Sequence, residues 1–553
     1  MVILTKRLKK GMGVVLSFLL SKYKLLKLLN QSNASTPKEQ SSAPNTPSNL
    51  TSSLKTNLKI IREFIGKNYD IVIREFALAE YGQIDAALIY LTGMTNPTII
   101  NESILKPLML ESCLKEKKTS LKPDLIDIIK TTLLTAGEVD QSNSIEDILD
   151  CCLSGQTIML VNGCSDALMI MTADWKSRNV SDPKTESVVR GPREGFVENL
   201  LTNTTLLRRK IRNPDLVLES MRIGQRTKTK ICIAYIKELA NPLLIEEIKR
   251  RLNDIKTDSI LESGLIEQYI EDAPFSIFAT ISNTEKPDAA AAKILEGRAA
   301  ILVDGTPFVL TVPMVMLESF QSAEDYYSRP YFASFIRMLR FLAYALSILA
   351  PATYVALTTF HQELIPTPLL FSMAAAQEGV PFPAVVEAIG MGVVFEILRE
   401  AGVRLPRPVG QAVSIVGALV IGQSAVTAGL IGAPMVIVVA LTAVASFVVP
   451  AQTDSGGVLR IIFVTLAGFS GGFGIIIGLI GLFIHLASLR SFGTPYLSPI
   501  APLSTMDLKD AFIRAPIWTM ITRPKLIGWQ DPKRKEFRLK PEPPPPQEDK
   551  QSK

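Results

Sequence analysis

Histidine and the common phosphate-binding motifs are almost absent from this sequence. The 553 residues include two histidines, His361 and His485, too few for a histidine-rich metal site or a conventional Ser–His–Asp relay. Neither a GxxxxGK[ST] phosphate loop nor a GxGxxG fingerprint occurs. We therefore expect no catalytic residues, no cofactor and no metal, and we do not expect an enzyme.

Cysteine is scarce and forms no framework. The five cysteines contain no CxxC pair, and the adjacent Cys151 and Cys152 are poorly placed to bridge each other because disulfide geometry is restrictive. Such usage is typical of a reducing compartment. The net charge of +6 is modest and the basic clusters carry no interleaved aromatics, so we predict no nucleic-acid binding.

Charge is missing altogether from one long stretch, Val409–Pro450. About 20 apolar residues cross a bilayer as a helix, and this stretch is roughly twice that length. Gly429, Gly432 and Pro434 interrupt it, which predicts two spanning helices joined by a tight turn. Its first half is also rich in polar and small residues, so it should face protein or water, not lipid.

A helical wheel separates those residues into two faces. The candidate pore-lining face holds Gln411, Ser414, Ala418, Gly422 and Ala425. The alternative face, for the pore or for packing, holds Gly417, Gln423, Ser424 and Thr427. Both faces cannot line one pore, and both could instead pack only against other helices.

Further uncharged runs complete a predicted α-helical polytopic transmembrane domain over residues 331–490. About four spans are expected: Phe341–Phe360, Val409–Leu430, Met435–Val449 and Ile461–Leu486. An even number places both termini on the same, cytoplasmic side, in keeping with the positive-inside rule. The alternative is that Ile461–Leu489, which is rich in glycine, forms a bent re-entrant pair.

One amphipathic helix in this region, Ala384–Ala401, contains Glu387. A charge near the centre of a bilayer is expensive. Either this helix lies in the membrane interface, or Glu387 faces a polar cavity.

Residues 54–330 read as a cytosolic α/β or α+β module. Thr157–Val161 and Ala167–Met171 flank an Asn-Gly turn, and two β-rich runs flank Asp304-Gly305, so both pairs are predicted to be hairpins. We expect two subdomains, divided around Leu153–Gly155.

The remaining segments are expected to lie outside the folded domains. Residues 1–30 form a basic amphipathic segment, residues 31–53 a disordered Ser/Thr/Pro-rich linker, and residues 491–553 a cytosolic, basic, proline-rich tail with little reason to fold.

Two polar motifs stand out beside the membrane region. The segment Ser322–Arg340 joins the module to the first span, and its candidate gating residues are Glu324, Asp325, Tyr326, Tyr327, Arg337 and Arg340. Arg190 and Arg193 flank a Gly-Pro turn. They could cradle an anion, or they could pair with Glu186 and Glu194 in a structural turn.

Several stretches together resemble the A-subunit family of bacterial spore germinant receptors, the GerA type, from about Tyr69 to Trp518. They include TESVVRGPREGFVENLLTNTTLLRRKI, EGRAAILVDGTPFVLTVP, AEDYYSRP, FHQELIPTPLL and SLRSFGTPYLSPIAP. The resemblance implies a multi-pass protein of the inner spore membrane with a cytosolic N-terminal region.

The resemblance also implies partners. A-subunits act with a transporter-like B-subunit, which senses the nutrient, and a lipoprotein C-subunit. They form a homo-oligomeric ring, a pentamer, that conducts monovalent cations when nutrient is present. The alternative is a membrane scaffold or transporter-like signalling subunit that conducts no ions itself.

Overall fold

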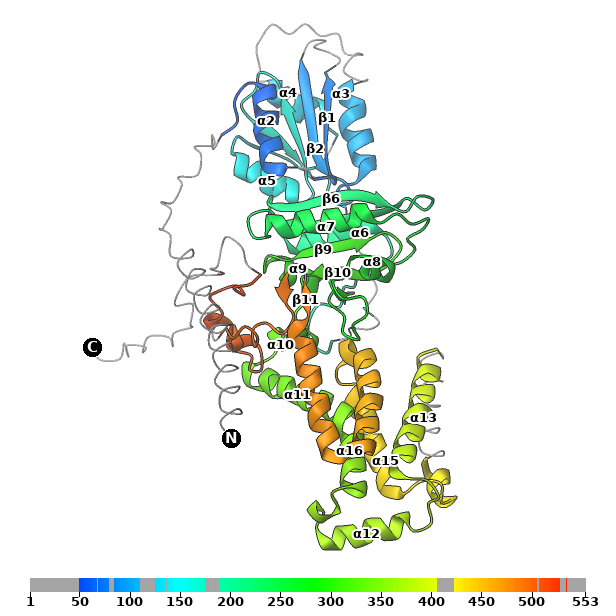
Figure 1. The fold of residues 1–553 in the computed structure, drawn as a ribbon. Helices are drawn as coiled ribbons and strands as arrows, with labels where there is room; N and C mark the ends of the chain where they lie inside the picture. Colours follow the sequence, from blue (N-terminus) through cyan, green and yellow to red (C-terminus); the bar gives the residue numbers. More distant parts are fainter. Residues whose placement is uncertain are drawn as a thin grey trace, which may run out of the picture. The chain divides into compact units, whose positions relative to one another are not determined.

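The computed structural model describes residues 49–527, except 67, 79–83, 110–124, 136, 175–182, 184–185, 187, 405–421 and 505–506, and it also describes Arg534. The elements all belong to one compact unit, Thr51–Lys553, and Figure 1 traces them. The predicted segment 1–30 and nearly all of the predicted linker 31–53 lie outside the described residues.

The first sheet is a five-stranded antiparallel sheet with strand order β1-β2-β4-β5-β3. Its strands are β1 (Ile71–Ala77), β2 (Asp85–Leu91), β3 (Val139–Ser142), β4 (Thr157–Val161) and β5 (Ala167–Ile170). Helices cover it: α2 (Leu54–Ile65), α3 (Lys106–Met109), α4 (Leu125–Ile128), α5 (Ile145–Leu153) and the π-helical turns Ile99–Leu105 and Ile129–Leu133. The predicted Asn-Gly hairpin is β4–β5, in which Thr157 pairs with Ile170.

The second sheet repeats the same connectivity, with strand order β6-β7-β9-β10-β8. Its strands are β6 (Leu216–Ile223), β7 (Thr229–Ile236), β8 (Ser282–Thr284), β9 (Ala299–Val303) and β10 (Val309–Val312). Helices α6 (Leu200–Lys210) and α9 (Pro287–Ile294) pack on one face. Helices α7 (Pro242–Asp254) and α8 (Ser263–Ile270) pack on the other. Because both faces are covered, β9 is apolar and buried at every position.

Every strand pairing in the two sheets is antiparallel among the described residues, so the module is of the α+β type. The second predicted hairpin is β9–β10, and Gly305 in its turn has a φ of 96°. The predicted division at Leu153–Gly155 is wrong, since β4 and β5 pair within the first sheet and the second sheet begins only at Leu216.

A glutamate on α8 makes the stability of this module depend on pH. Burial, together with the charges of Glu271 and Glu262, raises the pKa of Glu267 to about 7. The folded chain therefore holds a proton that the unfolded chain releases near pH 4.5, and the free energy of unfolding falls as pH rises between these values. We expect Glu267→Gln to raise the thermal midpoint at pH 8 and to change it little at pH 4.5. Replacing the exposed Glu246 with glutamine should leave the midpoint unchanged at both pH values.

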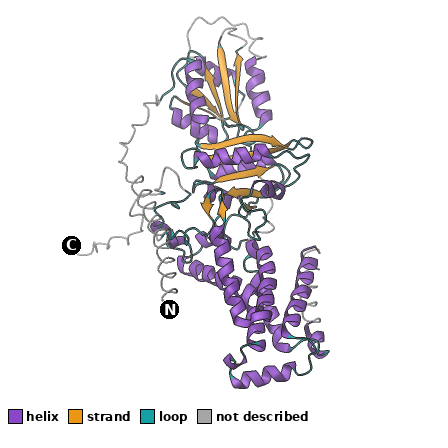
Figure 2. Cartoon of the chain, in the orientation of Figure 1, coloured by secondary structure: helices purple, strands orange, loops and turns teal. Residues whose placement is uncertain are grey.

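Helices dominate the described part of the C-terminal region (Figure 2). They include α11 (Pro330–Thr359), α12 (Thr367–Gln377), α13 (Ala384–Arg404), α15 (Ala433–Ser446) and α16 (Thr453–Ser488). By length and composition, Pro330–Thr359 and Pro450–Ser488 are long and apolar enough to cross a membrane, although the second is bent at Gly471, and α15 is apolar but shorter.

Helix α16 doubles back on itself at Gly471, where φ is 59° and ψ is −138°. Only glycine adopts such a conformation readily. Gly474 and Gly478 of the second arm lie against Leu466 and Phe463 of the first arm. This geometry shows the bend expected for Ile461–Leu489, while the re-entrant course of the pair stays a prediction.

The described residues after α16, up to Ile527, are folded, which corrects for this part of the tail the prediction that it has little reason to fold. Strands β11 (Arg490–Ser491) and β12 (Thr494–Pro495) and the 3-10 turns Leu508–Asp510 and Ile517–Thr519 are ordered. The Ser491 hydroxyl donates to the Thr280 carbonyl and accepts from the Met314 amide, and Tyr496 is fully buried. Several apolar residues of this segment are also buried, and their burial stabilises its fold. The composition of the whole tail, averaged with its polar and proline-rich end, does not show them.

Candidate functional site at the start of helix α11

The chain passes from the second sheet to α11 through a short helix, α10 (Ala323–Tyr327). Ser322 and Asp325 form a capping box: the Ser322 hydroxyl accepts from the Glu324 amide, and the Asp325 carboxylate accepts from the Ser322 amide. This reciprocal cap satisfies amides that a helix start otherwise leaves unpaired. It also holds the Asp325 carboxylate against α11.

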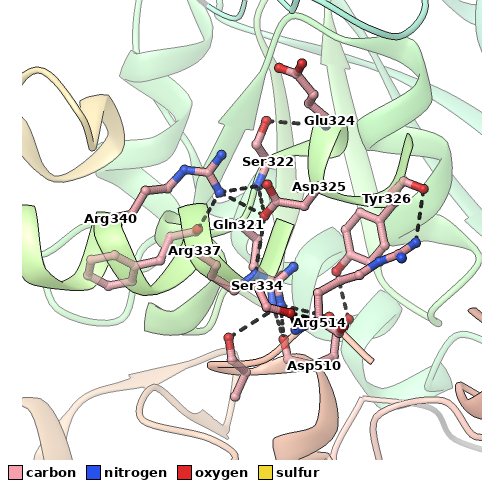
Figure 3. A network of polar contacts seen from close by, with 12 residues as sticks. Gln321, Ser322, Glu324, Asp325, Tyr326, Ser334, Arg337, Arg340, Asp510 and Arg514 are labelled. Atoms are coloured by element: carbon pink, nitrogen blue, oxygen red, sulfur yellow. Dashed lines mark hydrogen bonds and ion pairs between the residues drawn. The ribbon is translucent and has the colours of Figure 1, made fainter. Parts of the chain in front are cut away.

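Two arginines of α11 converge on that carboxylate (Figure 3). Arg337 Nε donates to Asp325 Oδ2 at 3.3 Å, and Arg340 Nη1 lies 2.8 Å from the same oxygen. Arg337 is 0% exposed and Asp325 is 3% exposed. The two arginines lie three residues apart, so they share one helix face.

The C-terminal segment completes the network. Arg337 Nη1 donates to the Asp510 carbonyl at 2.6 Å and to Asp510 Oδ1 at 2.9 Å. The Tyr326 hydroxyl donates to Asp510 Oδ2 at 2.7 Å, and Arg514 Nη2 donates to the Tyr326 carbonyl at 3.1 Å. Helix α10, the start of α11 and the distant C-terminal segment therefore meet at one buried guanidinium.

The protonation state of Tyr326 decides which group donates in its hydrogen bond to Asp510. Burial raises the pKa of Tyr326 well above its ordinary value, and the neighbouring Asp510 charge raises it further. Tyr326 therefore remains a neutral donor at physiological pH. Three arginines face two carboxylates here, and Arg337 Nη2 has no hydrogen-bond partner within the described part of the chain. Buried charge of this kind is costly unless it is paired.

The opposite side of α10 is held by the second sheet. The Tyr327 hydroxyl donates to Asp288 Oδ2 at the start of α9, at 2.6 Å. The Arg190 amide donates to Glu324 Oε1 at 3.3 Å. A Cβ atom at Gly191 would lie 2.9 Å from the Tyr327 ring, so only glycine fits this approach. Helix α10 is thus held between the sheet module on one side and α11 on the other.

The predicted pairing of Arg190 and Arg193 with neighbouring glutamates is wrong. Glu194 forms ion pairs with Arg209 and Lys210, and Glu186 accepts from the Thr284 hydroxyl. The Gly-Pro turn instead supplies backbone contacts to α10.

We expect Tyr327→Phe to lower the free energy of unfolding of the full chain by about 1 kcal/mol, because the Asp288 carboxylate loses a short hydrogen bond. Thermal unfolding of the solubilised chain measures this change. The matched control is Tyr331→Phe, whose side chain is 91% exposed and should tolerate the change. Equal thermal midpoints for the two variants would count against a stabilising hydrogen bond between Tyr327 and Asp288.

Inside the helical region, Glu387 is almost fully buried, at 4% exposed. Its Oε2 accepts from the Gly432 amide at 2.9 Å, at the start of α15. A carboxylate suits the positive end of a helix dipole. Helix α13 packs lengthwise on α15 and on the first arm of α16, since Val385 lies against Gly468 and Glu396 pairs with Arg460. Glu387 therefore faces the start of α15, and a polar cavity beside it stays a prediction.

Sequence reasoning missed three groups. Arg460 is 7% exposed and donates to the Ser347 carbonyl as well as to Glu396. His361 Nε2 accepts from the Gly472 amide at the bend of α16. Asp510 and Arg514 complete the network at α11. Of these groups, only Arg460 has a local signal in the sequence, a charge beside an apolar run.

The candidate pore residues are only partly placed. Gln411, Ser414, Gly417 and Ala418 lie outside the described residues. Residues 422–427 are helical. In this helix Gly422 is buried, and a Cβ atom added there would lie 3.3 Å from a methyl group of Val436, while Ala425 is half-buried. The other face, with Gln423, Ser424 and Thr427, is exposed.

Comparison with known proteins assigns the chain to a family. Residues 59–526 match the model of the Bacillus/Clostridium GerA spore germination protein. The chain is 46% identical over 496 residues to spore germination protein KA of Bacillus subtilis, covering 89% of this chain and 90% of that protein. It is 39% identical over 477 residues to spore germination protein GerLA of Bacillus cereus, covering 86% of this chain and 95% of that protein.

A solved structure also matches. The crystal structure of the N-terminal domain of the A subunit of the Bacillus megaterium spore germinant receptor GerK3 is 36% identical and covers 48% of this chain and 96% of that domain, with a TM-score of 0.38. The matched family and the two sequence relatives are all spore germination proteins. The chain therefore belongs to the GerA family of spore germination receptor A-subunits.

Proposed function

We propose that this chain is the A-subunit of a nutrient-responsive germination receptor and that it forms, as a homo-oligomer, a cation channel in the inner spore membrane. The observation that carries the channel is the exposed polar face of Gln423, Ser424 and Thr427 within an apolar helical region. Exposed polar side chains at membrane depth require water or protein beside them. A ring of subunits, proposed as a pentamer, supplies both.

The course of the helices supports six crossings in place of the four expected. Tyr344 contacts Ser455 and His361 contacts Gly472, so α11 and the first arm of α16 run in the same direction, away from the second sheet. Helices α13 and α15 run in the opposite direction, toward the second sheet. Glu387, near the start of α13, meets Gly432 at the start of α15, and Gln452, after α15, donates to Ser319, which precedes α11. The end of α13 and the start of α15 thus lie at opposite ends of the region, as the two ends of a further crossing would.

The chain enters and leaves the helical region on the same side. The Met314 amide, before α11, donates to the Ser491 hydroxyl, after α16, at 2.9 Å. An even number of crossings follows, and it supports placing both termini on the cytoplasmic side. On this account the sheet module and residues 490–527 are cytosolic.

Gating is assigned to the network at the start of α11. Glu324, Asp325, Tyr326 and Tyr327 of α10 contact the sheet module on one side and Arg337 and Arg340 on the other. A displacement of the module would therefore move α11 directly, or break buried ion pairs. The trigger is proposed to be the nutrient, bound by the transporter-like B-subunit, with the lipoprotein C-subunit as a third partner and monovalent cations as the permeant species.

The pore face is testable at Ser424. Replacing this exposed serine with leucine puts an apolar side chain on the proposed water-lined face, and we expect nutrient-triggered potassium release from spores to fall at least severalfold. The control is Val426→Leu, two residues along the same helix, where the side chain is half-buried. Spores with this variant should release potassium normally. Normal release from Ser424→Leu spores that contain the assembled receptor would support the alternative, a scaffold subunit that does not conduct.

A further inference from the structure

The tip of the β6–β7 hairpin carries a concentration of positive charge that the gating network does not use. Arg222 of β6 and Lys230 of β7 are directly opposite each other across the two strands. Like charges at such positions destabilise an antiparallel pair. Neither residue has a carboxylate within 4.0 Å among the residues that the structure describes.

These two cations line a cavity of about 540 Å³ at the hairpin tip. Lys228, Thr227 and Thr229 also line it, and the Asp304–Gly305 turn closes one side. The three cations and the single carboxylate of Asp304 leave the lining with a net charge of +2. Asp304 Oδ1 accepts from the Leu200 amide at 3.0 Å, which fixes that carboxylate at the start of α6.

The cavity is built on a braced hairpin. The Thr229 hydroxyl donates to the Ile260 carbonyl, and the Arg226 amide donates to the Asp258 carbonyl at 2.8 Å. Lys230 Nζ lies 4.6 Å from the centroid of the Tyr69 ring, which restricts the lysine side chain. The hairpin backbone is therefore braced and the Lys230 side chain is restrained, while Arg222, Lys228 and Lys230 all remain exposed to a ligand.

We propose that this cavity binds a phosphate group. Arginine and lysine side chains are the usual ligands of phosphate, since charge-assisted hydrogen bonds to its oxygens are short and strong. A bound dianion would offset the repulsion between Arg222 and Lys230, and the Thr227 hydroxyl, which among the described residues only accepts hydrogen bonds, can donate to a remaining oxygen. The phosphate could belong to a soluble metabolite or to a lipid headgroup. The site is independent of the proposed channel.

Calorimetric titration of the solubilised full chain with inorganic pyrophosphate, in phosphate-free buffer, tests the site. We expect saturable binding that weakens about tenfold or more in the double variant Arg222→Gln/Lys230→Gln, a loss of about 1.4 kcal/mol. The matched control is Arg226→Gln on the same hairpin, because Arg226 pairs with Asp258 and does not line the cavity. It should bind pyrophosphate within about twofold of the unchanged chain, as expected for a surface ion pair.

A second measurement separates binding from folding. Without pyrophosphate, the double variant should have an unchanged or higher thermal midpoint, because the repulsion is removed, and pyrophosphate should no longer raise that midpoint. In a parallel arm, binding to phosphatidylglycerol vesicles but not to phosphatidylcholine vesicles, lost in the double variant, would identify a lipid headgroup as the source of the phosphate. If neither probe binds, or if Arg226→Gln weakens binding as much as the double variant does, the proposal is overturned.

Discussion

Replacing Arg337 with methionine is expected to lower the free energy of unfolding of the full chain by about 3–5 kcal/mol, the usual result of removing one partner from a buried ion pair. Arg337 is 0% exposed and contacts both Asp325 and Asp510. Without it, Asp510 keeps the hydrogen bond from Tyr326 but has no other ion pair among the described residues. Thermal unfolding of the solubilised chain measures the loss, and nutrient-triggered potassium release should fall with it.

The control lies at the start of the same helix. Arg329 is the residue before Pro330, its side chain is exposed, and it has no ion pair among the residues described. Arg329→Met should therefore change stability by less than about 0.5 kcal/mol. Adding Asp510→Asn to Arg337→Met should recover part of the loss, since the unpaired carboxylate is removed as well. Equal midpoints for Arg337→Met and Arg329→Met would contradict the network.

The second large effect is expected at Gly474, where the two arms of α16 cross most closely. A Cβ atom there would overlap the carbonyl oxygen of Leu466, which is backbone and cannot rotate away. Gly474→Ala should therefore separate the arms or unfold the bend, at a cost of about 3 kcal/mol or more. The amount of full-length chain recovered from membranes, together with its thermal midpoint, measures the effect.

Gly481 provides a matched control in the same arm, because nothing lies within 4 Å of a Cβ atom at that position. Gly481→Ala should be neutral or slightly stabilising, since alanine is the better helix former. If both substitutions behave alike, the second arm does not pack on the first as described.

Local patterns predicted the sheet module well. The Asn-Gly and Asp-Gly turns lie between β4 and β5 and between β9 and β10, as expected, because each turn dipeptide sets the geometry of the strands beside it. Helix α5 begins after Ser144, whose hydroxyl accepts from the Asp147 amide. The division of the two sheets was misplaced because β4 pairs with β2, about 70 residues earlier in the chain, and no local signal records that pairing.

Only the part of the candidate site that α10 and α11 form was predictable from the sequence. The capping residues of α10 and the arginines of α11 are near one another in sequence. Their position between a soluble module and an apolar helix indicated that they couple the module to the helix. Asp510 lies 173 residues from Arg337, in a segment whose composition suggested an unfolded tail. Likewise, Arg460 and Ser347 meet only because α11 and α16 pack side by side.

Ion conduction by the assembled receptor is the central claim, and one measurement tests it directly. The full-length chain, purified with its B- and C-type partner subunits and reconstituted into potassium-loaded liposomes, should release potassium when a cognate nutrient is added. Release should be lost with Ser424→Leu and retained with Val426→Leu. A correctly assembled oligomer that never releases potassium under these conditions would contradict the account and leave a non-conducting signalling subunit.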